Sequence, residues 1–145
     1  MRATSSDGPA QTAALAASFA EQLGPGDVIL LEGDLGAGKT TFARALCAAL
    51  GVEGPVTSPT FGVAHRYDAA VGLIAHLDLH RLGTVGLVDR ELIDDELDAA
   101  DVAIVEWPSG APGLEDEATW RVSLAHAGED RRDIVIAALR PEATA

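Results

Sequence analysis

The sequence of 145 residues contains no asparagine, one lysine and one cysteine. A lone cysteine, Cys47, cannot form a disulfide bond within the chain, and its helical context predicts a small buried hydrophobic residue rather than a nucleophile. No apolar run reaches the 18 residues typical of a transmembrane helix, and the N-terminal residues lack the apolar core of a secretory signal. These absences predict a cytoplasmic protein without a disulfide framework.

Positive charge is also scarce. Ten Lys and Arg residues stand against 23 Asp and Glu residues, which gives a formal net charge of −13. Affinity for nucleic-acid backbones comes mainly from Lys and Arg, so a chain this acidic repels nucleic acid as a whole. We therefore expect any role in nucleic-acid chemistry to depend on a protein partner, with tRNA or other nucleic acid contacted only indirectly.

The single lysine lies in the stretch Gly33–Thr41, which reads GDLGAGKTT and matches the pattern G-x-x-x-x-G-K-[ST]. An apolar run over 28–31 precedes this stretch, and a helical pattern that follows it extends to about residue 50. Strand, glycine-rich loop and helix in this order predict a phosphate-binding loop. At average residue usage the pattern arises by chance at roughly one position in tens of thousands. A turn that holds an anion incidentally is therefore the less favoured interpretation.

Each residue type in this loop has a physical role. Glycines let backbone N–H groups surround a phosphate, and the N-terminus of the helix adds its positive end. Lys39 is expected to reach the terminal phosphates, and the Thr40 hydroxyl is expected to ligate Mg²⁺. The residues predicted to surround the phosphates are Gly33, Leu35, Gly36, Ala37, Gly38, Lys39, Thr40 and Thr41.

The rest of the chain predicts one α/β domain over residues 1–145, with loose termini at 1–10 and 141–145. Apolar periodicity and turn residues predict the following elements: a helix from 11–12 to 23, a strand at 28–32, a hairpin of 61–67 and 71–77 with its turn at 68–70, a helix over 83–97, a buried parallel strand at 102–105, and an antiparallel pair of 119–124 and 133–139. This order indicates a mixed, mostly parallel sheet flanked by helices, with antiparallel additions.

Two carboxylates stand at predicted strand ends, where the ligand crevice of a parallel sheet lies. Asp78 is the better placed of the two to hold Mg²⁺ with Thr40, and Glu106 is the second candidate. One carboxylate could hold the metal while the other orients water. The alternatives are a turn or helix-capping role for Asp78 and a surface charge for Glu106. Trp107 either fills the core or covers the site.

Other residues give weaker indications. The hydroxyl-rich segment 57–61 is either an ordinary turn or a switch that senses the terminal phosphate. His65, His76 and His80 do not have the spacing of a zinc site, and Cys47 is far from them in sequence. The guanine-reading motif N-K-x-D is excluded because the chain has no asparagine, so ATP is favoured over GTP.

The combination of motifs resembles the TsaE family, the small bacterial ATPases needed for threonylcarbamoyl modification of the tRNA adenosine beside the anticodon. The resemblance covers nearly the whole chain. Its carriers are Gly33–Thr41, SPTF at 58–61, HLDLHR at 76–81 and IVEWP at 104–108. The family has Tyr where this chain has His80, a supporting position.

The resemblance implies roles for matching residues and partners for the protein. It places Lys39 and the loop at the phosphates of ATP, and Thr40 and Asp78 at Mg²⁺. It makes Glu106 a catalytic or metal-assisting carboxylate. The further positions that it implies near the nucleotide are Thr60 in the switch-like segment, Trp107, and Thr12 near the base. It also implies slow ATP hydrolysis that depends on the TsaD and TsaB proteins.

Two other functions remain open from the residues alone. A small-molecule kinase with a similar fold needs a lid that carries arginine, and the acidic segment 109–118 has none. A regulatory module that binds nucleotide without turnover needs no second carboxylate, whereas this chain offers both Asp78 and Glu106.

Overall fold

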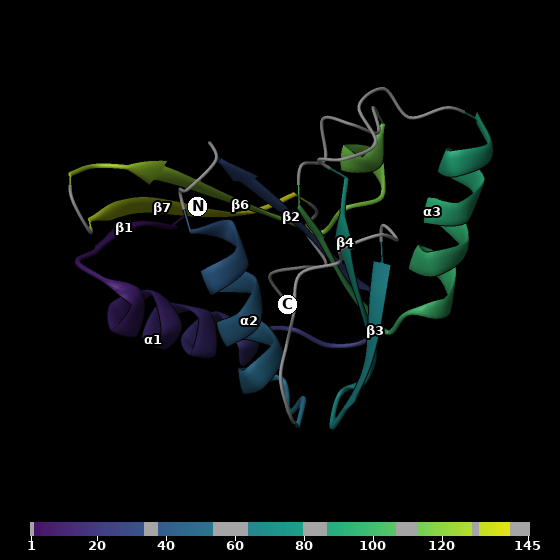
Figure 1. Ribbon diagram of the computed structural model, residues 1–145, viewed down its shortest axis with the longest axis horizontal. Helices are drawn as coiled ribbons and strands as arrows, with labels where there is room; N and C mark the ends of the chain where they lie inside the picture. Colours follow the sequence, from purple (N-terminus) through teal and green to yellow (C-terminus); the bar gives the residue numbers. More distant parts are fainter. Residues whose placement is uncertain are drawn as a thin grey trace.

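A mixed sheet is the frame of the computed structural model, which describes residues 2–33, 38–53, 64–79, 87–106, 113–128 and 131–139 (Figure 1). Within these residues the sheet has seven strands in the order β1-β7-β6-β2-β5-β4-β3. Their bounds are Arg2–Ser6 for β1, Asp27–Gly33 for β2, Ala64–Ala69 for β3, Gly72–Asp78 for β4, Val102–Glu106 for β5, Trp120–His126 for β6 and Arg132–Ala138 for β7.

The centre of the sheet is parallel. Strand β2 pairs in parallel with β5 on one side and with β6 on the other, and β4 pairs in parallel with β5. All five residues of β5 are buried, as expected for a strand covered on both faces. The hairpin β3–β4 and the strands β7 and β1 extend the sheet with antiparallel pairs. The predicted mixed α/β sheet with antiparallel additions is thus confirmed, with a parallel core and three of its six described strand pairings antiparallel.

Helices cover both faces of the sheet (Figure 1). Helices α1 (Pro9–Ala20) and α2 (Lys39–Ala49) lie on one face, where the Phe19 ring lies 5.0 Å from Trp120 and 6.4 Å from Phe42 between ring centroids. Helix α3 (Leu87–Ala99) and the short 3₁₀ helix η3 (Leu114–Asp116) cover the opposite face. There Ile93 of α3 packs in a cluster with Leu30 and Leu77 of the sheet. No described helix is long and apolar enough to cross a membrane.

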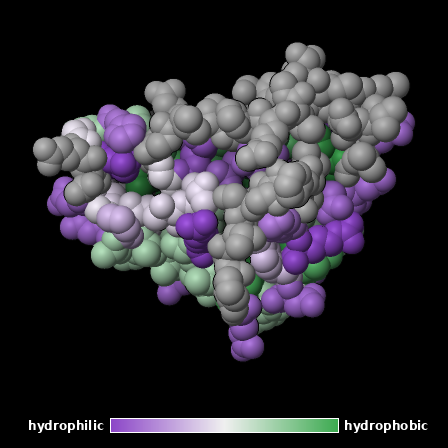
Figure 2. Space-filling view, viewed as in Figure 1, coloured by the Kyte–Doolittle hydropathy of each residue, from purple (hydrophilic) through white to green (hydrophobic). Residues whose placement is uncertain are grey.

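The surfaces of the helices differ in character. Figure 2 shows weakly hydrophobic side chains gathered over α1 and hydrophilic side chains over α3. Exposed residues of α1 include Ala10, Ala14 and Ala17, whereas exposed residues of α3 include Glu91 and Asp95. Much of the negative charge of the chain therefore lies on α3, away from the face that α1 and α2 cover.

The N-terminal part of the chain corrects one expectation. Residues 2–6 are not a loose lead-in but form the edge strand β1, and α1 begins at Pro9. The short polar side chains show no apolar alternation, because an edge strand is held mainly by backbone pairing, here to β7. Ser6 adds a buried hydrogen bond, with its Oγ 2.7 Å from Thr12 Oγ1. The expected tail at 141–145 lies outside the described residues.

The hairpin between β3 and β4 turns later than predicted, since β3 ends two residues later and β4 begins one residue later. Strand β3 continues to Ala69, and β4 begins at Gly72, whose φ is +126°. A Cβ at Gly72 would lie 2.2 Å from Asp101 Oδ2, the same oxygen that accepts a hydrogen bond from the Leu73 N–H at 2.7 Å. Asp101 and Leu73 are also joined through the Asp101 N–H and the Leu73 carbonyl at 2.8 Å. Because Gly72 has no side chain, the Asp101 carboxylate can approach and accept the hydrogen bond from Leu73 at the start of β4.

Replacing Gly72 with alanine should destabilise the fold more than backbone strain alone does. We expect Gly72→Ala to lower the free energy of unfolding by about 3 kcal/mol, because positive φ costs about 1–3 kcal/mol and the displaced Asp101 hydrogen bond about 1 kcal/mol more. Gly26→Ala is the matched control, since Gly26 has φ +100° but open space around its Cα. Urea denaturation of both variants measures the difference, and equal losses would show that Asp101 is not displaced.

Candidate functional site

The site is built where the parallel strands end. Strand β2 ends at Gly33, β4 at Asp78 and β5 at Glu106, and all three carboxyl ends meet at one edge because the strands run in the same direction. Helix α2 begins at the same edge after Gly38, which caps it in a left-handed conformation with φ +99°. The first N–H groups of α2 therefore point toward the loop, as an anion site requires. The ends of the predicted phosphate loop are thus in place.

The side chain of Lys39 reaches back to the end of β2. Lys39 is the first residue of α2, only 5% of it is exposed, and its ammonium group donates a hydrogen bond to the carbonyl oxygen of Gly33. The contact directs the side chain from the start of the helix back to the end of β2. A buried ammonium is costly unless its charge is compensated, and a bound anion is one group that can compensate it.

Glu106 joins three elements. It ends β5 and is 2% exposed. Its Oε1 accepts a hydrogen bond from Thr40 Oγ1 on α2 at 3.3 Å, and its Oε2 lies 2.5 Å from His76 Nε2 on β4. The carboxylate predicted from the strand end is therefore a buried group at the centre of the site and not a surface charge.

Asp78 lies next to Glu106 across the sheet. The two are register partners in the β4–β5 pairing, and Asp78 is only partly exposed. Neighbouring strands lie about 4.8 Å apart, so the two side chains share one small region on the same side as Thr40. Carboxylate and hydroxyl oxygens are hard ligands of the kind that Mg²⁺ takes. The structure thus brings together the three predicted metal ligands, Thr40, Asp78 and Glu106.

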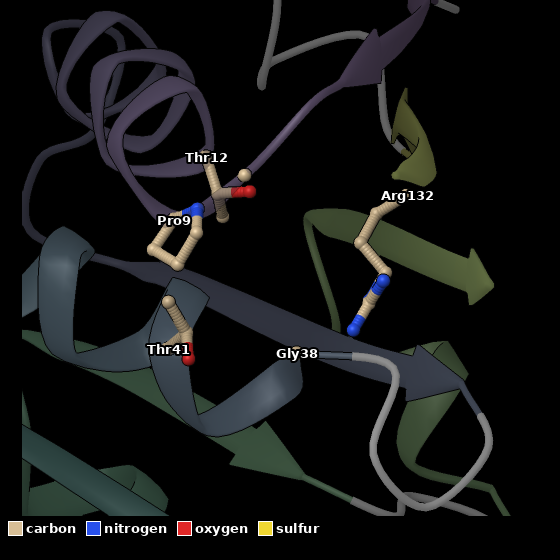
Figure 3. Close-up of a pocket in the computed structure, with 6 residues that line it drawn as sticks. Pro9, Thr12, Gly38, Thr41 and Arg132 are labelled. Carbon is tan, nitrogen blue, oxygen red and sulfur yellow. The ribbon is translucent and has the colours of Figure 1, made fainter. Parts of the chain in front are cut away.

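A small cavity of about 70 Å³ opens beside the start of α2 (Figure 3). Thr12 of α1 and Thr41 of α2 line it together with Gly8, Pro9, Gly38 and Arg132. Thr12 is 4% exposed and pairs with Ser6, whereas Thr41 is exposed. Thr12 and Thr41, which are far apart in sequence, therefore line the same cavity beside Gly38.

Two residues that the structure places at the site, Arg132 and His76, were not predicted to belong to it. Arg132 begins β7 and its side chain extends toward Gly38 (Figure 3), where its Nε would lie 4.0 Å from a Cβ on that glycine. The antiparallel pair β6–β7 was predicted, but it is the parallel pairing of β6 with β2 that carries Arg132 to the end of β2, and no local pattern encodes that long-range pairing. His76 is part of the HLDLHR motif, but the sequence predicts no site role for it beyond excluding a zinc site. Its two-residue spacing before Asp78 was the available signal, because it places both side chains on one face of β4.

Several predicted site residues lie outside the described residues and stay predictions. These are Leu35, Gly36 and Ala37 of the phosphate loop, Thr60 with the rest of 57–61, Trp107, and His80. Of the other histidines weighed for a zinc site, His65 lies opposite His76 in the β3–β4 register, and its Nδ1 is 3.1 Å from Tyr67 Oη.

Comparisons with known proteins identify the family of the chain. The family model described as threonylcarbamoyl adenosine biosynthesis protein TsaE matches residues 6–134. The chain is 34% identical to the tRNA threonylcarbamoyladenosine biosynthesis protein TsaE of Bacillus subtilis, over 90% of this chain and 82% of that protein. It is 40% identical to the protein of the same name from Streptomyces coelicolor, over 81% and 80%. The crystal structure of Bacillus subtilis YdiB superposes with a TM-score of 0.75 at 30% identity, covering 99% of this chain and 88% of that one.

Cys47 packs in the core behind the site. It is wholly buried in α2, and burial raises the pKa of its thiol to about 12, with a further contribution from the negative charge of Glu106. The thiolate is the reactive form, so Cys47 is unreactive in the native protein. The prediction of a small buried hydrophobic residue is confirmed.

Thiol labelling should therefore report only unfolding. At pH 8 to 9 we expect Ellman's reagent to modify Cys47 at a rate at least 100-fold lower in the native protein than in 6 M urea, because the native thiol is both buried and protonated. The chain has no other cysteine, so the absorbance change counts this residue alone. Rapid labelling of the native protein would contradict the burial of Cys47.

Proposed function

The chain belongs to the TsaE family and takes part in tRNA threonylcarbamoyladenosine biosynthesis, and we propose that its part there is to bind and hydrolyse ATP. The observation that carries the proposal is the position of Glu106, buried at the end of β5 and hydrogen-bonded to Thr40 in the first turn of the helix that follows the phosphate loop. A nucleotide bound by the loop would present its terminal phosphate to this carboxylate. We propose that residues 1–145 act as one domain in this role.

The phosphate loop would hold the phosphates of ATP. The start of α2 supplies backbone N–H groups, and Lys39 supplies the positive charge. The cavity lined by Thr12, Thr41 and Arg132 would take another part of the nucleotide through two hydroxyl groups and a guanidinium. Leu35, Gly36 and Ala37 would complete the loop, and Trp107 and Thr60 would lie near the nucleotide.

Mg²⁺ fits the donor set at the strand ends. Thr40, Asp78 and Glu106 would hold it, directly or through its water shell. When bound, the ion would neutralise negative charge on the phosphates.

Glu106 would orient the attacking water and accept its proton. In that role the carboxylate must be fixed in place and ionised. Its contacts with Thr40 and His76 fix both oxygens. Hydrolysis releases ADP and phosphate, and Lys39 would stabilise the charge that develops on the transferred group.

The acidic character of the chain supports an indirect role toward tRNA. A net charge of −13 disfavours contact with the tRNA backbone, and the exposed acidic residues of α3 include Glu91 and Asp95. We propose that ATP turnover supports a transferase complex of the TsaD and TsaB type, and that this complex performs the chemistry on tRNA.

Removing the charge of Glu106 should separate binding from turnover. We expect Glu106→Gln to bind ATP within about threefold of the wild type and to lose about 100-fold or more in kcat, because the amide cannot accept the proton from water. Calorimetry measures the first quantity and phosphate release the second. Glu96→Gln on α3 is the control, since within the described residues it removes a carboxylate that pairs with the exposed Arg66. Unchanged hydrolysis in Glu106→Gln would remove Glu106 from the mechanism.

Partner proteins should accelerate the reaction. We expect the purified protein to hydrolyse ATP slowly alone and at least tenfold faster with a TsaB–TsaD complex, since small phosphate-loop ATPases gain catalytic groups or order from partners. A pull-down with and without ATP tests whether binding depends on the nucleotide. Fast turnover with a small-molecule acceptor, and no effect of the complex, would favour a kinase instead.

A further inference from the structure

His76 is a polar residue in the middle of the core. It is 0% exposed on β4, and it faces the same side of the sheet as Ile74, which belongs to the apolar cluster under α1 and α2. Its Nε2 lies 2.5 Å from Glu106 Oε2. Its Nδ1 is buried and has no hydrogen-bond partner among the described residues.

The contact determines which nitrogen carries the proton. An ionised carboxylate only accepts hydrogen bonds, so His76 Nε2–H is the donor. Nδ1 is then left in the apolar interior, where an unsatisfied polar atom is unfavourable. A leucine would fill this position without that cost. Packing alone therefore does not account for a histidine here, and the hydrogen bond to Glu106 does.

The two oxygens of Glu106 have separate partners. Oε2 is held from β4 by His76, whereas Oε1 faces Thr40 at the start of α2. The terminal torsion of a glutamate side chain is broad and has no strong intrinsic preference. A hydrogen bond to one oxygen therefore sets the direction of the other. Without His76 the carboxylate could turn away from the helix, although β5 would remain in place.

We propose that His76 is a positioning residue for Glu106. Its Nε2–H fixes Oε2, so that Oε1 alone is presented to Thr40 and to the water and nucleotide beyond it. The proposal rests on the hydrolytic role proposed for Glu106, but the orientation of the carboxylate is a separate property that can be measured without turnover.

Two substitutions and a control test this role. His76→Leu removes the donor, and His76→Gln keeps an N–H that can reach the place of Nε2. Ile74→Val is the control for lost packing, because Ile74 is wholly buried on the same strand and face. We expect His76→Leu to lower kcat at least tenfold with KM within twofold of the wild type. His76→Gln should recover at least one third of the wild-type kcat, and Ile74→Val should keep it.

Crystal structures supply the readout that is independent of activity. In His76→Leu, Glu106 Oε1 should leave hydrogen-bond distance of Thr40 Oγ1, whereas His76→Gln should keep the contact. If His76→Leu does not fold, His76→Asn replaces it, since its shorter amide cannot reach Glu106. Wild-type kcat and an unmoved Glu106 in the variant without the donor would overturn the proposal. If the wild type shows no turnover with its partners, the hydrolytic role proposed for Glu106 is rejected. The crystal structures of the variants still test whether His76 positions the Glu106 carboxylate.

Discussion

The parallel pairing of β2 with β5 is the constraint on which the site depends. In this register Leu31 lies beside Glu106, two residues before Gly33 ends β2. After β2 and the phosphate loop the chain continues as α2, which packs on the face of the sheet that α1 also covers. The first turn of α2 therefore lies next to the end of β5. Pairing of β4 with β5 then sets Asp78 beside Glu106. A shift of this register by one residue would turn Glu106 to the opposite face and away from Thr40.

Burial strengthens the polar contacts that this arrangement creates. Lys39, His76 and Glu106 are each at least 95% buried, and all three lie on the side of the sheet that α2 covers. In a medium of low polarity, hydrogen bonds and charges interact more strongly than in water, and unpaired groups are more costly. The apolar cluster of α1 and α2 therefore does more than stabilise the fold, because it holds the polar groups of the site in a dry environment.

Local patterns were sufficient to predict the elements that are buried or that carry a motif. The continuous apolar run at 102–105 became β5, and the glycine pattern located the junction of β2 and α2. The edge strand β1 escaped prediction because its pairing is made by the backbone and its side chains are short and polar. Arg132 escaped because strand order, which depends on long-range pairing, brings it to Gly38. The interaction of His76 with Glu106 likewise crosses two strands that are separated by α3 in sequence.

The single lysine of the chain has a consequence for chemistry at the protein's surface. Its ε-ammonium is buried in the phosphate loop, so no other lysine is available on the outside of the molecule. Attractive charge contacts that the protein makes with acidic groups of other molecules come mainly from its nine arginines, whose planar guanidinium prefers paired, directional hydrogen bonds. Apart from the α-amino group, reagents and enzymes that acylate amines have one target in this chain, and the burial of Lys39 restricts their access to it.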